Sequence, residues 1–462
     1  MRKTKIVATL GPASSDYEVM RKLAVEGVDV FRLNFAHGVL QDKEELISKT
    51  RKLEEELGKP IAVLADIPGR GPRIGNMPHV YLSVGEKVIL EFGSKISDNP
   101  HIIPVPYEEL LETVYHGDII LLADGRVQVK VDRKIGHEVE GTIISEGELR
   151  SNVSITIKGR PLPFPALSER DKKFVEFAVK KDVDYIALSF VQSRDDILEL
   201  RNFLESLGAD NIKIISKIET KSAIDNIDSI TKESDTIMVA RGDLGVQISL
   251  EDIPYLENLL IGKALSLGKP VILATQVLES MIESPIPTRA EIMDIATAVE
   301  KGVDAIMLSG ETAIGKHPVE AIKWLVRIIE RVEKYIKFPR TEPKEDEPLY
   351  VKFNRSIVSL AEYLNAKIVA YSTRGITAIA IARFRPKSEI YIVTNSKKTQ
   401  RQLTLVWGVK AILSDGDVKT LEKLSEIVIR HGYAKKGDLL VLTLGWKRFP
   451  TNVQEIMIEE VI

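Results

Sequence analysis

The sequence of 462 residues contains no cysteine. Disulfide bonds, cysteine metal sites and cysteine nucleophiles are therefore all excluded. A chain without cysteine fits a reducing compartment or a hot habitat, but it does not establish either. The sequence also has no apolar run long enough for a signal-peptide core or a membrane span. We therefore expect a cytoplasmic protein.

An excess of charge of one sign is also missing. Lysine and arginine number 64, aspartate and glutamate 67, and the formal net charge is -3. We therefore expect neither a nucleic-acid partner nor a membrane partner. Hydrophobic residues make up 44% of the chain and charged residues 28%, the profile of a globular protein rather than of a disordered chain. The length predicts more than one domain.

Short apolar runs rich in β-branched residues recur along the chain, and most are followed by a helical pattern. Such runs are typical of parallel strands covered on both faces. Two of the helices are predicted at Asp42–Leu57, before Gly58, and at Ser193–Leu207, where Ser193 can act as the N-cap. Eight such units predict an α/β fold with a (β/α)8 TIM barrel, and a doubly wound sheet is the alternative. The predicted strands are Lys5–Thr9, Asp29–Leu33, Ile61–Ala65, Tyr185–Leu188, Lys213–Ser216, Thr236–Ala240, Val271–Ala274 and Ala305–Leu308.

Two segments interrupt this rhythm. Between Asp66 and about Pro161 no helical pattern appears, and alternating stretches such as Val80–Glu91 predict an inserted β-rich, β-barrel-like lid domain. A charged, proline-rich stretch at Pro339–Pro348 predicts a linker to a C-terminal α/β domain, where strands again alternate with helices. The expected domains are the barrel (1–66 and 162–338), the lid (67–161) and the C-terminal domain (339–462).

Charged side chains follow two neighbouring predicted strands, at the end where a barrel places its active site. Lys217 and Glu219 stand two residues apart and, if the chain stays extended, point the same way. A lysine there is costly unless it is paired or binds an anion, so a structural ion pair with Glu219 or Asp243 is the alternative to a function. In the next unit Gly242 lets a ligand approach the backbone closely. Glu219 and Asp243 together predict a site for Mg²⁺ or Mn²⁺, although Asp243 alone fits an ordinary Gly-Asp turn.

Other strand ends carry groups that bind anions. Thr275 has a hydroxyl that can hold a phosphate, a carboxylate or a proton-carrying water, or can simply bond to the backbone. Arg32 and Asn34 lie on one face of an extended segment, and arginine suits bidentate contacts with phosphate or carboxylate. Gly310–His317 nearly matches a phosphate-binding P-loop. His317 stands where that loop needs a metal-binding Ser or Thr, so we treat the match as chance.

Seven longer motifs are spread over the chain in a fixed order. They are Thr-Lys-Ile-Val-Ala-Thr-Leu-Gly-Pro-Ala-Ser (4–14), Arg-Leu-Asn-Phe (32–35), Lys-Ile-Ile-Ser-Lys-Ile-Glu (213–219), Met-Val-Ala-Arg-Gly-Asp-Leu-Gly-Val (238–246), Ala-Thr-Gln-Val-Leu-Glu-Ser-Met (274–281), Pro-Thr-Arg-Ala-Glu (287–291) and Ile-Met-Leu-Ser-Gly-Glu-Thr-Ala (306–313). In this order they resemble the pyruvate kinase family. The resemblance implies a (β/α)8 barrel with an inserted β lid and a C-terminal α/β domain, in agreement with the residue patterns.

The resemblance also implies an activity, the transfer of the phosphoryl group of phosphoenolpyruvate to ADP, which gives pyruvate and ATP in the last step of glycolysis. Glu219 and Asp243 would hold Mg²⁺, and Lys217 would neutralise charge on the phosphoryl group and the enolate. Thr275, through water and Ser309, would supply the proton to the enolate carbon. The resemblance further implies that the substrate contacts Arg32, which is also catalytic, Ser189, Lys217, Gly242, Asp243 and Thr275. It implies that the nucleotide contacts Pro12, Asn34, His37, Arg73 and Arg170.

The sequence departs from the family at the monovalent-cation site. Ala36 and Ile67 replace a serine and a threonine, so two side-chain oxygens are missing. Gly71 stands at the Glu/Lys position tied to K⁺ dependence, and Arg70 could supply a fixed positive charge instead. The side chains that remain are Asn34 and Asp66. We therefore expect activity without K⁺.

The C-terminal domain contains Ser-Thr-Arg-Gly-Ile-Thr (372–377) where relatives bind an effector phosphate. This segment can form an anion-binding nest or a plain strand-to-helix turn. The final loop, Gly445–Pro450, lacks the glycine-rich run used for fructose 1,6-bisphosphate, so regulation by that sugar is not expected. The resemblance implies a homotetramer. The candidate phosphate contacts are Ser372, Thr373, Arg374, Gly375 and Thr377.

Two other functions remain open from the residues alone. Another metal-dependent barrel enzyme acting on phosphoenolpyruvate or pyruvate would share the Glu219–Asp243 site but would not need the lid. A non-catalytic sensor of phosphorylated metabolites would not need the charges at the barrel mouth, and these charges are present.

Overall fold

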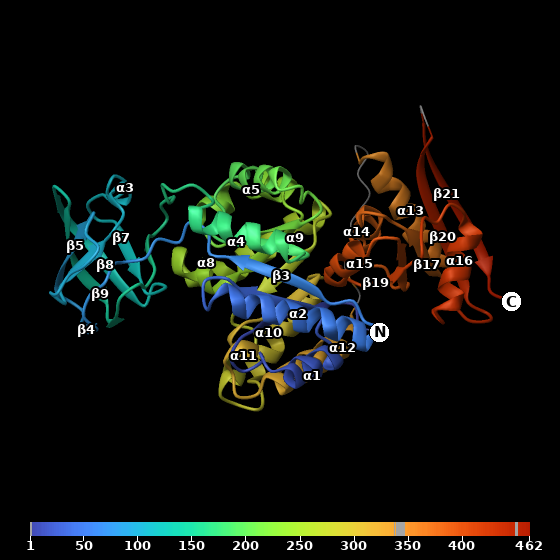
Figure 1. Ribbon diagram of the computed structural model, residues 1–462, viewed down its shortest axis with the longest axis horizontal. Helices are drawn as coiled ribbons and strands as arrows, with labels where there is room; N and C mark the ends of the chain where they lie inside the picture. Colours follow the sequence, from blue (N-terminus) through green and yellow to red (C-terminus); the bar gives the residue numbers. More distant parts are fainter. Residues whose placement is uncertain (1, 337, 339–346, 449–450) are drawn as a thin grey trace.

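The computed structural model describes residues 2–336, 338, 347–448 and 451–462. Three bodies lie in a row along the long axis, with the β-rich lid at one end, the barrel in the middle and the C-terminal domain at the other end (Figure 1). Most of the predicted linker at Pro339–Pro348 falls on residues 339–346, outside the described residues. The domain boundaries given above stay predictions.

Eight parallel strands within residues 2–336 form a closed barrel, so the TIM barrel prediction is confirmed and the doubly wound sheet is excluded. β1 pairs with β2 on one side and with β16 on the other, which closes the ring. The strands are β1 (Lys5–Leu10), β2 (Val30–Asn34), β3 (Ala62–Ile67), β12 (Tyr185–Leu188), β13 (Lys213–Ile218), β14 (Thr236–Ala240), β15 (Val271–Ala274) and β16 (Ala305–Leu308).

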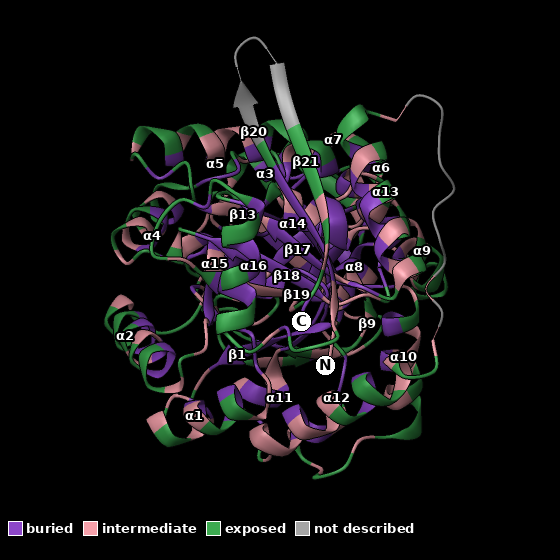
Figure 2. Cartoon of the chain, turned by 90° about the vertical axis from the view of Figure 1, so that its right-hand side faces the viewer, coloured by how far each residue is buried: buried purple, intermediate pink, exposed green. Residues whose placement is uncertain are grey.

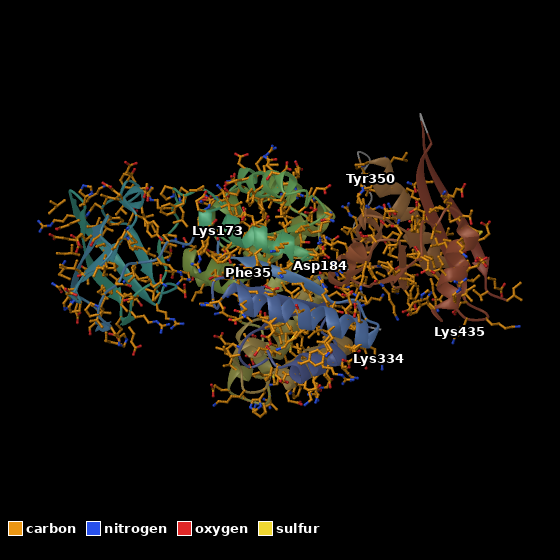
Figure 3. All side chains as sticks on the ribbon, viewed as in Figure 1. Phe35, Lys173, Asp184, Lys334, Tyr350 and Lys435 are labelled. Atoms are coloured by element: carbon orange, nitrogen blue, oxygen red, sulfur yellow. The ribbon has the colours of Figure 1, made fainter. Side chains whose placement is uncertain are left out.

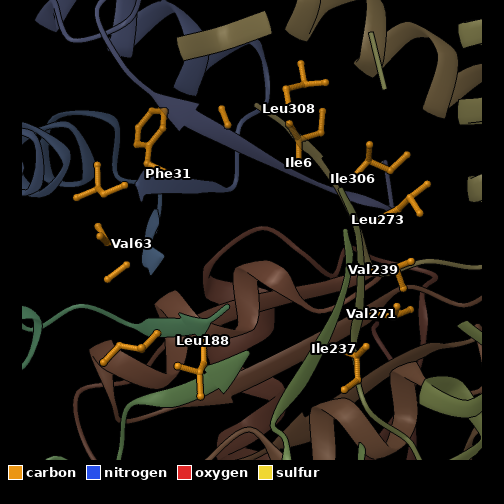
Figure 4. Packing of buried hydrophobic residues seen from close by; sticks show 14 of the residues in the cluster. Ile6, Phe31, Val63, Leu188, Ile237, Val239, Val271, Leu273, Ile306 and Leu308 are labelled. Atoms are coloured by element: carbon orange, nitrogen blue, oxygen red, sulfur yellow. The ribbon is translucent and has the colours of Figure 1, made fainter. Parts of the chain in front are cut away.

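The side chains of each strand alternate between the barrel interior and the surrounding helices, because successive residues of a strand face opposite ways. Ile6, Phe31 and Val63 belong to the cluster that packs between strands and helices (Figure 4). Val7 and Leu64, each one residue further along, belong to the cluster inside the barrel. Both faces are therefore buried, which explains the continuous apolar runs of the sequence.

Helices surround the barrel and expose their outer faces (Figure 2), and the barrel strands inside this ring of helices are largely buried. Ser193 caps α5 as predicted. No helix of the described residues combines the length and the apolar character needed to span a membrane. The barrel helices are α1 (Tyr17–Glu26), α2 (Leu40–Leu57), α4 (Glu169–Lys180), α5 (Arg194–Ser206), α6 (Lys221–Asp225), α7 (Ile227–Glu233), α8 (Arg241–Gln247), α9 (Ile253–Ser266), α10 (Arg289–Glu300), α11 (Gly310–Ala313) and α12 (Pro318–Glu333).

The insertion after β3 is β-rich, as predicted, and has a separate apolar core. A six-stranded sheet runs in the order β11-β7-β8-β9-β5-β6, beside a pair formed by β4 and β10. It also contains one helical turn, α3 (Glu108–Leu111), which the sequence did not predict. Its strands are β4 (Val80–Leu82), β5 (Lys87–Phe92), β6 (Ile102–Val105), β7 (Ile119–Leu122), β8 (Val127–Ile135), β9 (Glu138–Ser145), β10 (Gly147–Leu149) and β11 (Ile155–Ile157).

The C-terminal domain is the predicted α/β unit, with a five-stranded sheet in the order β19-β18-β17-β20-β21. β20 and β21 form a long antiparallel hairpin in place of the expected final loop, of which residues 449–450 are outside the described range. The elements are α13 (Leu349–Leu364), β17 (Lys367–Tyr371), α14 (Ile376–Ala382), β18 (Ile390–Thr394), α15 (Lys397–Gln402), β19 (Val409–Leu413), α16 (Leu421–Arg430), β20 (Leu439–Arg448) and β21 (Thr451–Glu460).

Four aspartates mark the barrel floor, the end of the barrel at which its strands begin. Each stands directly before an alternate strand and accepts a hydrogen bond from a backbone N–H of the preceding strand, at N···O distances of 2.8 to 3.1 Å. Each also forms an ion pair with an arginine. The pairs are Asp29–Arg2, Asp184–Arg401, Asp235–Arg201 and Asp304–Arg385.

The C-terminal domain completes this floor. Leu405 is fully buried and packs in the same cluster as the inward side chains of the barrel strands. Arg401 and Arg385, also from the C-terminal domain, pair with Asp184 and Asp304. Asp184 lies at the border between the barrel and the C-terminal domain (Figure 3). The barrel core is therefore shared between the two domains.

Candidate active site

Lys217 and Glu219 lie side by side at the barrel mouth. β13 continues to Ile218, two residues past the predicted end, so the chain is still extended at Lys217. The side chains point the same way, as expected, with 2.8 Å between Lys217 Nζ and Glu219 Oε1. Both side chains are buried. A buried ammonium group needs such a partner because burial in a low-dielectric interior penalises an isolated charge.

A second acid–base pair joins the first. Arg32 on β2 and Asp66 on β3 form an ion pair with 2.6 Å between Nη2 and Oδ2. Lys217 Nζ lies 3.5 Å from Asp66 Oδ1 and donates a hydrogen bond of 2.7 Å to Ser189 Oγ. Two cations and two carboxylates thus alternate across the mouth. The sequence placed all of these residues at strand ends but did not show that Asp66 links Arg32 to Lys217.

The pKa values in this cluster reflect burial and the neighbouring charges. Burial alone would lower the pKa of Lys217, but the carboxylates of Asp66, Glu219 and Asp243 outweigh burial and raise this pKa above its ordinary value. Burial would likewise raise the pKa of Asp66, but the charges of Lys217 and Arg32 keep it below the usual range. Burial, and then the nearby carboxylate of Glu219, raise the pKa of Asp243 to about 7.

The Glu219–Asp243 pair fits a divalent cation. The Glu219 carboxylate raises the pKa of Asp243, which shows that the two groups are held close together, and a cation between them would relieve the repulsion. Among the described residues no group of three or more acidic, histidine or cysteine side chains is arranged to hold a metal. These two carboxylates would therefore leave most coordination positions to waters and ligand oxygens, as is usual for Mg²⁺.

Thr275 lies opposite the start of α8. Its Oγ1 accepts a hydrogen bond of 2.8 Å from the backbone N–H of Gly242 and donates one of 2.6 Å to the carbonyl of Ala274. Thr275 and Gln276 both have positive φ angles, 67° and 53°. This conformation is rare for residues with a Cβ, and especially for a β-branched one. The Thr275 hydroxyl is therefore held at one point by a turn that costs free energy.

Ser309 and Glu311 occupy the end of β16. The Ser309 hydroxyl is buried and has no hydrogen-bond partner within the described part of the chain. The Glu311 carboxylate accepts hydrogen bonds from the backbone N–H groups of Ser309 (2.7 Å) and Leu278 (3.0 Å). The segment that resembles a P-loop, Gly310–His317, thus contains α11, and its acidic side chain, Glu311, is bonded to backbone N–H groups. The orphaned Ser309 hydroxyl is available to a water or a ligand.

Among the described residues, no hydrogen bond or ion pair joins the residues expected near the nucleotide to one another. Pro12 and His37 are exposed. Arg73 donates to the carbonyl of Asn152 at 2.8 Å, and Arg170 lies over the ring of Phe174. The direct contacts of the described residues therefore do not bring these side chains together.

The monovalent-cation remnants are engaged within the protein. Asn34 Oδ1 accepts a hydrogen bond of 3.0 Å from the Ala36 N–H, and Asp66 is shared by Arg32 and Lys217. Arg70 forms an ion pair with Asp196 at the start of α5. Its charge is therefore directed at that helix, and the idea that it replaces the monovalent cation gains no support.

Asp124 of the lid is a site residue that the sequence reasoning missed. It lies in the β7–β8 turn with φ 56°, and its carboxylate accepts a hydrogen bond of 2.6 Å from Ser154 Oγ. Its negative charge helps to raise the pKa of Asp243. Gln247 of α8 donates a hydrogen bond of 2.8 Å to Thr156 of the lid, which ties the lid to the barrel mouth. The sequence signal that could have identified Asp124 is the Ala-Asp-Gly turn at residues 123–125.

The candidate effector segment forms the turn between β17 and α14. Gly375 has a φ of 79°, and Ser372 is buried. Arg374 and Gly375 line a cavity of about 30 Å³ together with Lys213 and Asp235 of the barrel floor. The segment therefore faces the junction of the C-terminal domain and the barrel.

Comparisons with known proteins agree over most of the chain. A family model described as pyruvate kinase, barrel domain, matches residues 1–322, and the pyruvate kinase alpha/beta domain matches residues 353–457. Pyruvate kinase of Thermotoga maritima is 38% identical over 96% of each chain, and that of Staphylococcus haemolyticus is 41% identical over 96% of this chain and 78% of the relative. A solved structure of pyruvate kinase from Pyrobaculum aerophilum has a TM-score of 0.89, 31% identity and 99% coverage of both chains. The chain therefore belongs to the pyruvate kinase family, the enzymes of glycolysis that take the phosphoryl group of phosphoenolpyruvate and release pyruvate.

Proposed function

We propose that the acceptor of the phosphoryl group is ADP and that the reaction uses Mg²⁺ or Mn²⁺ held by Glu219 and Asp243. The observation that carries this proposal is the buried Lys217 ammonium, 2.8 Å from Glu219 and 2.7 Å from Ser189 at the barrel mouth. Phosphoryl transfer depends mainly on positioning and on charge neutralisation. A fixed cation beside a pair of carboxylates that suit a divalent metal supplies both.

In the proposed mechanism Arg32 and Lys217 face the phosphate of phosphoenolpyruvate, next to Ser189. The bond from phosphorus to the enol oxygen breaks, and a bond to a β-phosphate oxygen of ADP forms. Lys217 stabilises the negative charge left on the enolate oxygen, and when bound the metal adds positive charge there. The backbone amide of Asp243 and the Thr275 hydroxyl hold the substrate carboxylate, and Gly242, whose amide donates to the Thr275 hydroxyl, lies against it.

The enolate then takes up a proton at its methylene carbon to become pyruvate. We propose that Thr275 delivers this proton, directly or through a water held by Ser309. The orphaned hydroxyl of Ser309 supports this role, because a buried hydroxyl without a partner favours an ordered water or a ligand.

We also propose that the enzyme works without K⁺. Ala36 and Ile67 bring no side-chain oxygen, and the oxygen of Asn34 is already bonded to the Ala36 N–H. With K⁺ replaced by a large organic cation the rate should stay the same, and a strong fall would contradict this proposal.

The remaining assignments are proposals that rest on the family. The protein is proposed to be cytoplasmic and to form a homotetramer. The nucleotide is proposed to contact Pro12, Asn34, His37, Arg73 and Arg170. An effector phosphate is proposed to bind at residues 372–377. Exposed apolar side chains such as Tyr255 on α9 and Met293 on α10 support assembly, since such residues are candidates for burial between subunits. Sedimentation equilibrium checks the assembly state.

A coupled assay tests the main proposal. The protein is supplied with phosphoenolpyruvate, ADP and Mg²⁺, and ATP and pyruvate are measured separately. We expect equal amounts of both products, with loss of activity when a chelator removes the metal. If folded protein forms no ATP under these conditions, the proposal is wrong.

A further inference from the structure

Arg241, the first residue of α8, has a buried guanidinium that joins four elements of the barrel mouth. Its Nη1 donates to both carboxylate oxygens of Asp294 on α10, at 2.8 and 2.7 Å, and lies 3.3 Å from Glu257 Oε2 on α9. Its Nη2 donates to the carbonyl oxygens of Thr275 and Gln276, at 3.1 Å each. The carboxylates fix one side of the planar fork, so the other side is aimed at the two carbonyls.

The two carbonyls belong to the residues with strained backbone. Thr275 and Gln276 are in left-handed conformations, which are unfavourable for residues that carry a Cβ. A strained conformation persists only where surrounding contacts impose it. Nη2 of Arg241 donates hydrogen bonds to both carbonyls of this turn and so holds them in one orientation.

Two consecutive residues of α8, Arg241 and Gly242, hold Thr275 at two points. The side chain of Arg241 holds the Thr275 carbonyl, and the backbone N–H of the next residue, Gly242, holds the Thr275 hydroxyl at 2.8 Å. With carbonyl and hydroxyl both fixed to one rigid segment, the hydroxyl direction is fixed as well. The Thr275 hydroxyl is the group to which the proposed function gives the proton transfer.

We propose that Arg241 is a positioning residue for proton transfer to the enolate, acting through Thr275 rather than touching the substrate. This inference rests on the proposed function of the site. Its distinctive consequence is that loss of the contacts between Arg241 and the Thr275 turn slows protonation of the enolate carbon more than phosphoryl transfer. The phosphoryl step depends on Lys217 and on the carboxylates of Glu219, just after β13, and Asp243 of α8, and among the described residues the Arg241 side chain bonds to none of these three groups.

Arg241→Lys tests the proposal, because lysine keeps the charge but cannot present a planar fork to two carboxylates and two carbonyls. Two rates are measured for each variant. One is ATP formation from phosphoenolpyruvate and ADP. The other is exchange of the pyruvate methyl protons in D₂O with Mg²⁺ and inorganic phosphate, followed by NMR. We expect the exchange rate to fall about 100-fold, as for a misplaced reacting group, and ATP formation to fall much less.

Arg385→Lys is the matched control, since Arg385 is also buried and binds a carbonyl and an aspartate, but at the barrel floor. It should lower stability without changing the ratio of exchange to ATP formation. If Arg241→Lys does not fold, Asp294→Asn loosens the same guanidinium and should shift the ratio in the same direction.

The outcomes separate the two proposals. If the wild-type protein forms no ATP, the proposed function fails. If it forms ATP but shows no methyl exchange, or if both mouth variants keep the wild-type ratio, the role of Arg241 is refuted while phosphoryl transfer stands.

Discussion

At the scale of single residues, the site is a balance of buried charges. Lys217 and Arg32 face Asp66 and Glu219, and each charge is stabilised by an opposite one within hydrogen-bonding distance. Such a cluster is fixed before substrate arrives, so little reorganisation is needed when charge moves during the reaction. Removing one member should therefore impair the reaction far more than substrate binding.

Replacing Lys217 by methionine is the sharpest test of this balance. We expect kcat to fall by at least about 100-fold, because a preorganised cation is lost from the developing charge. Methionine preserves much of the side-chain volume, so the far-UV circular dichroism spectrum should stay native. Turnover close to that of the wild type would refute the role of Lys217.

Metal binding should depend on pH through Asp243. Its pKa is raised to about 7, so below that value the carboxyl is protonated and must lose a proton before it can bind a metal. Affinity for Mn²⁺ should therefore rise with pH through about 7 and fall by about tenfold per unit well below it. Titration calorimetry over this range measures the slope. In Asp243→Asn the slope should disappear, and a flat profile in the wild type would contradict the assignment.

The sequence predicted the members of this site better than their contacts. Lys217, Glu219 and Asp243 follow apolar strands, so their meeting at one barrel end follows from topology. The approach of Asp124 does not, because it depends on how a separately folded insertion sits over the mouth. The partner of Arg70 was missed for a similar reason, since Asp196 is 126 residues away and no local pattern joins the two.

At the scale of elements, the connection from β3 into the lid is tightly packed. Gly69 has a φ of 64°, and a Cβ there would lie 2.5 Å from the Ser189 carbonyl oxygen. Gly71 lies against the Phe190 ring, 3.0 Å from an added Cβ. The glycine-rich hinge therefore rests directly on the turn that carries Ser189.

Gly69→Ala should disturb both stability and substrate binding. Gly58→Ala is the matched control, because Gly58 has a similar φ of 58° but open space around its Cβ position. Both variants lose roughly 1–2 kcal/mol from the left-handed conformation. Only Gly69→Ala should also raise KM for phosphoenolpyruvate, as the Ser189 backbone must move. Urea unfolding and steady-state kinetics compare the two, and an unchanged KM would show that the hinge does not position Ser189.

Barrel strands were easier to predict than the hairpin of the C-terminal domain. The barrel strands are short, mostly apolar and separated by helices, so their pattern is distinct. β21 carries polar and charged residues such as Gln454 and Glu455, and it is held mainly by pairing along its length with β20, with Met457 packed against the core of the domain. Cross-strand pairing of this kind depends on the partner strand and leaves a weak local signal.

At the scale of the whole molecule, the C-terminal domain is part of the barrel's support. Arg401 and Asp184 pair at 2.7 Å with side-chain exposures of 5% and 0%, so the ion pair is desolvated. Asp184 also pairs with Arg51 of α2, at 2.9 Å, so Arg401 supplies one of the two cations that neutralise this buried carboxylate. The interface between these domains therefore contributes to barrel stability.

Arg401→Met should lower the free energy of unfolding, but by less than the roughly 3–5 kcal/mol expected when a buried charge loses its only partner, because Arg51 still faces Asp184. The control is Arg21→Met, whose pair with Glu56 is exposed (42% and 38%) and should contribute far less to stability, because solvent screens it. Urea denaturation measures both variants. Equal losses would mean that Arg401 is not needed to neutralise Asp184.

The shared barrel floor also sets an order of events during synthesis. Arg401 follows Asp184 by 217 positions and Arg385 follows Asp304 by 81, so the ribosome releases each acid well before its base. Before the C-terminal domain is made, the nascent barrel also lacks Leu405, which packs against the inward side chains of its strands. Most proteins made on the ribosome can fold domain by domain from the N-terminus. Here the first domain to emerge is among the last to be finished, and a chain cut short before its final quarter would present to the cell's proteases an open barrel in which Asp304 lacks its arginine.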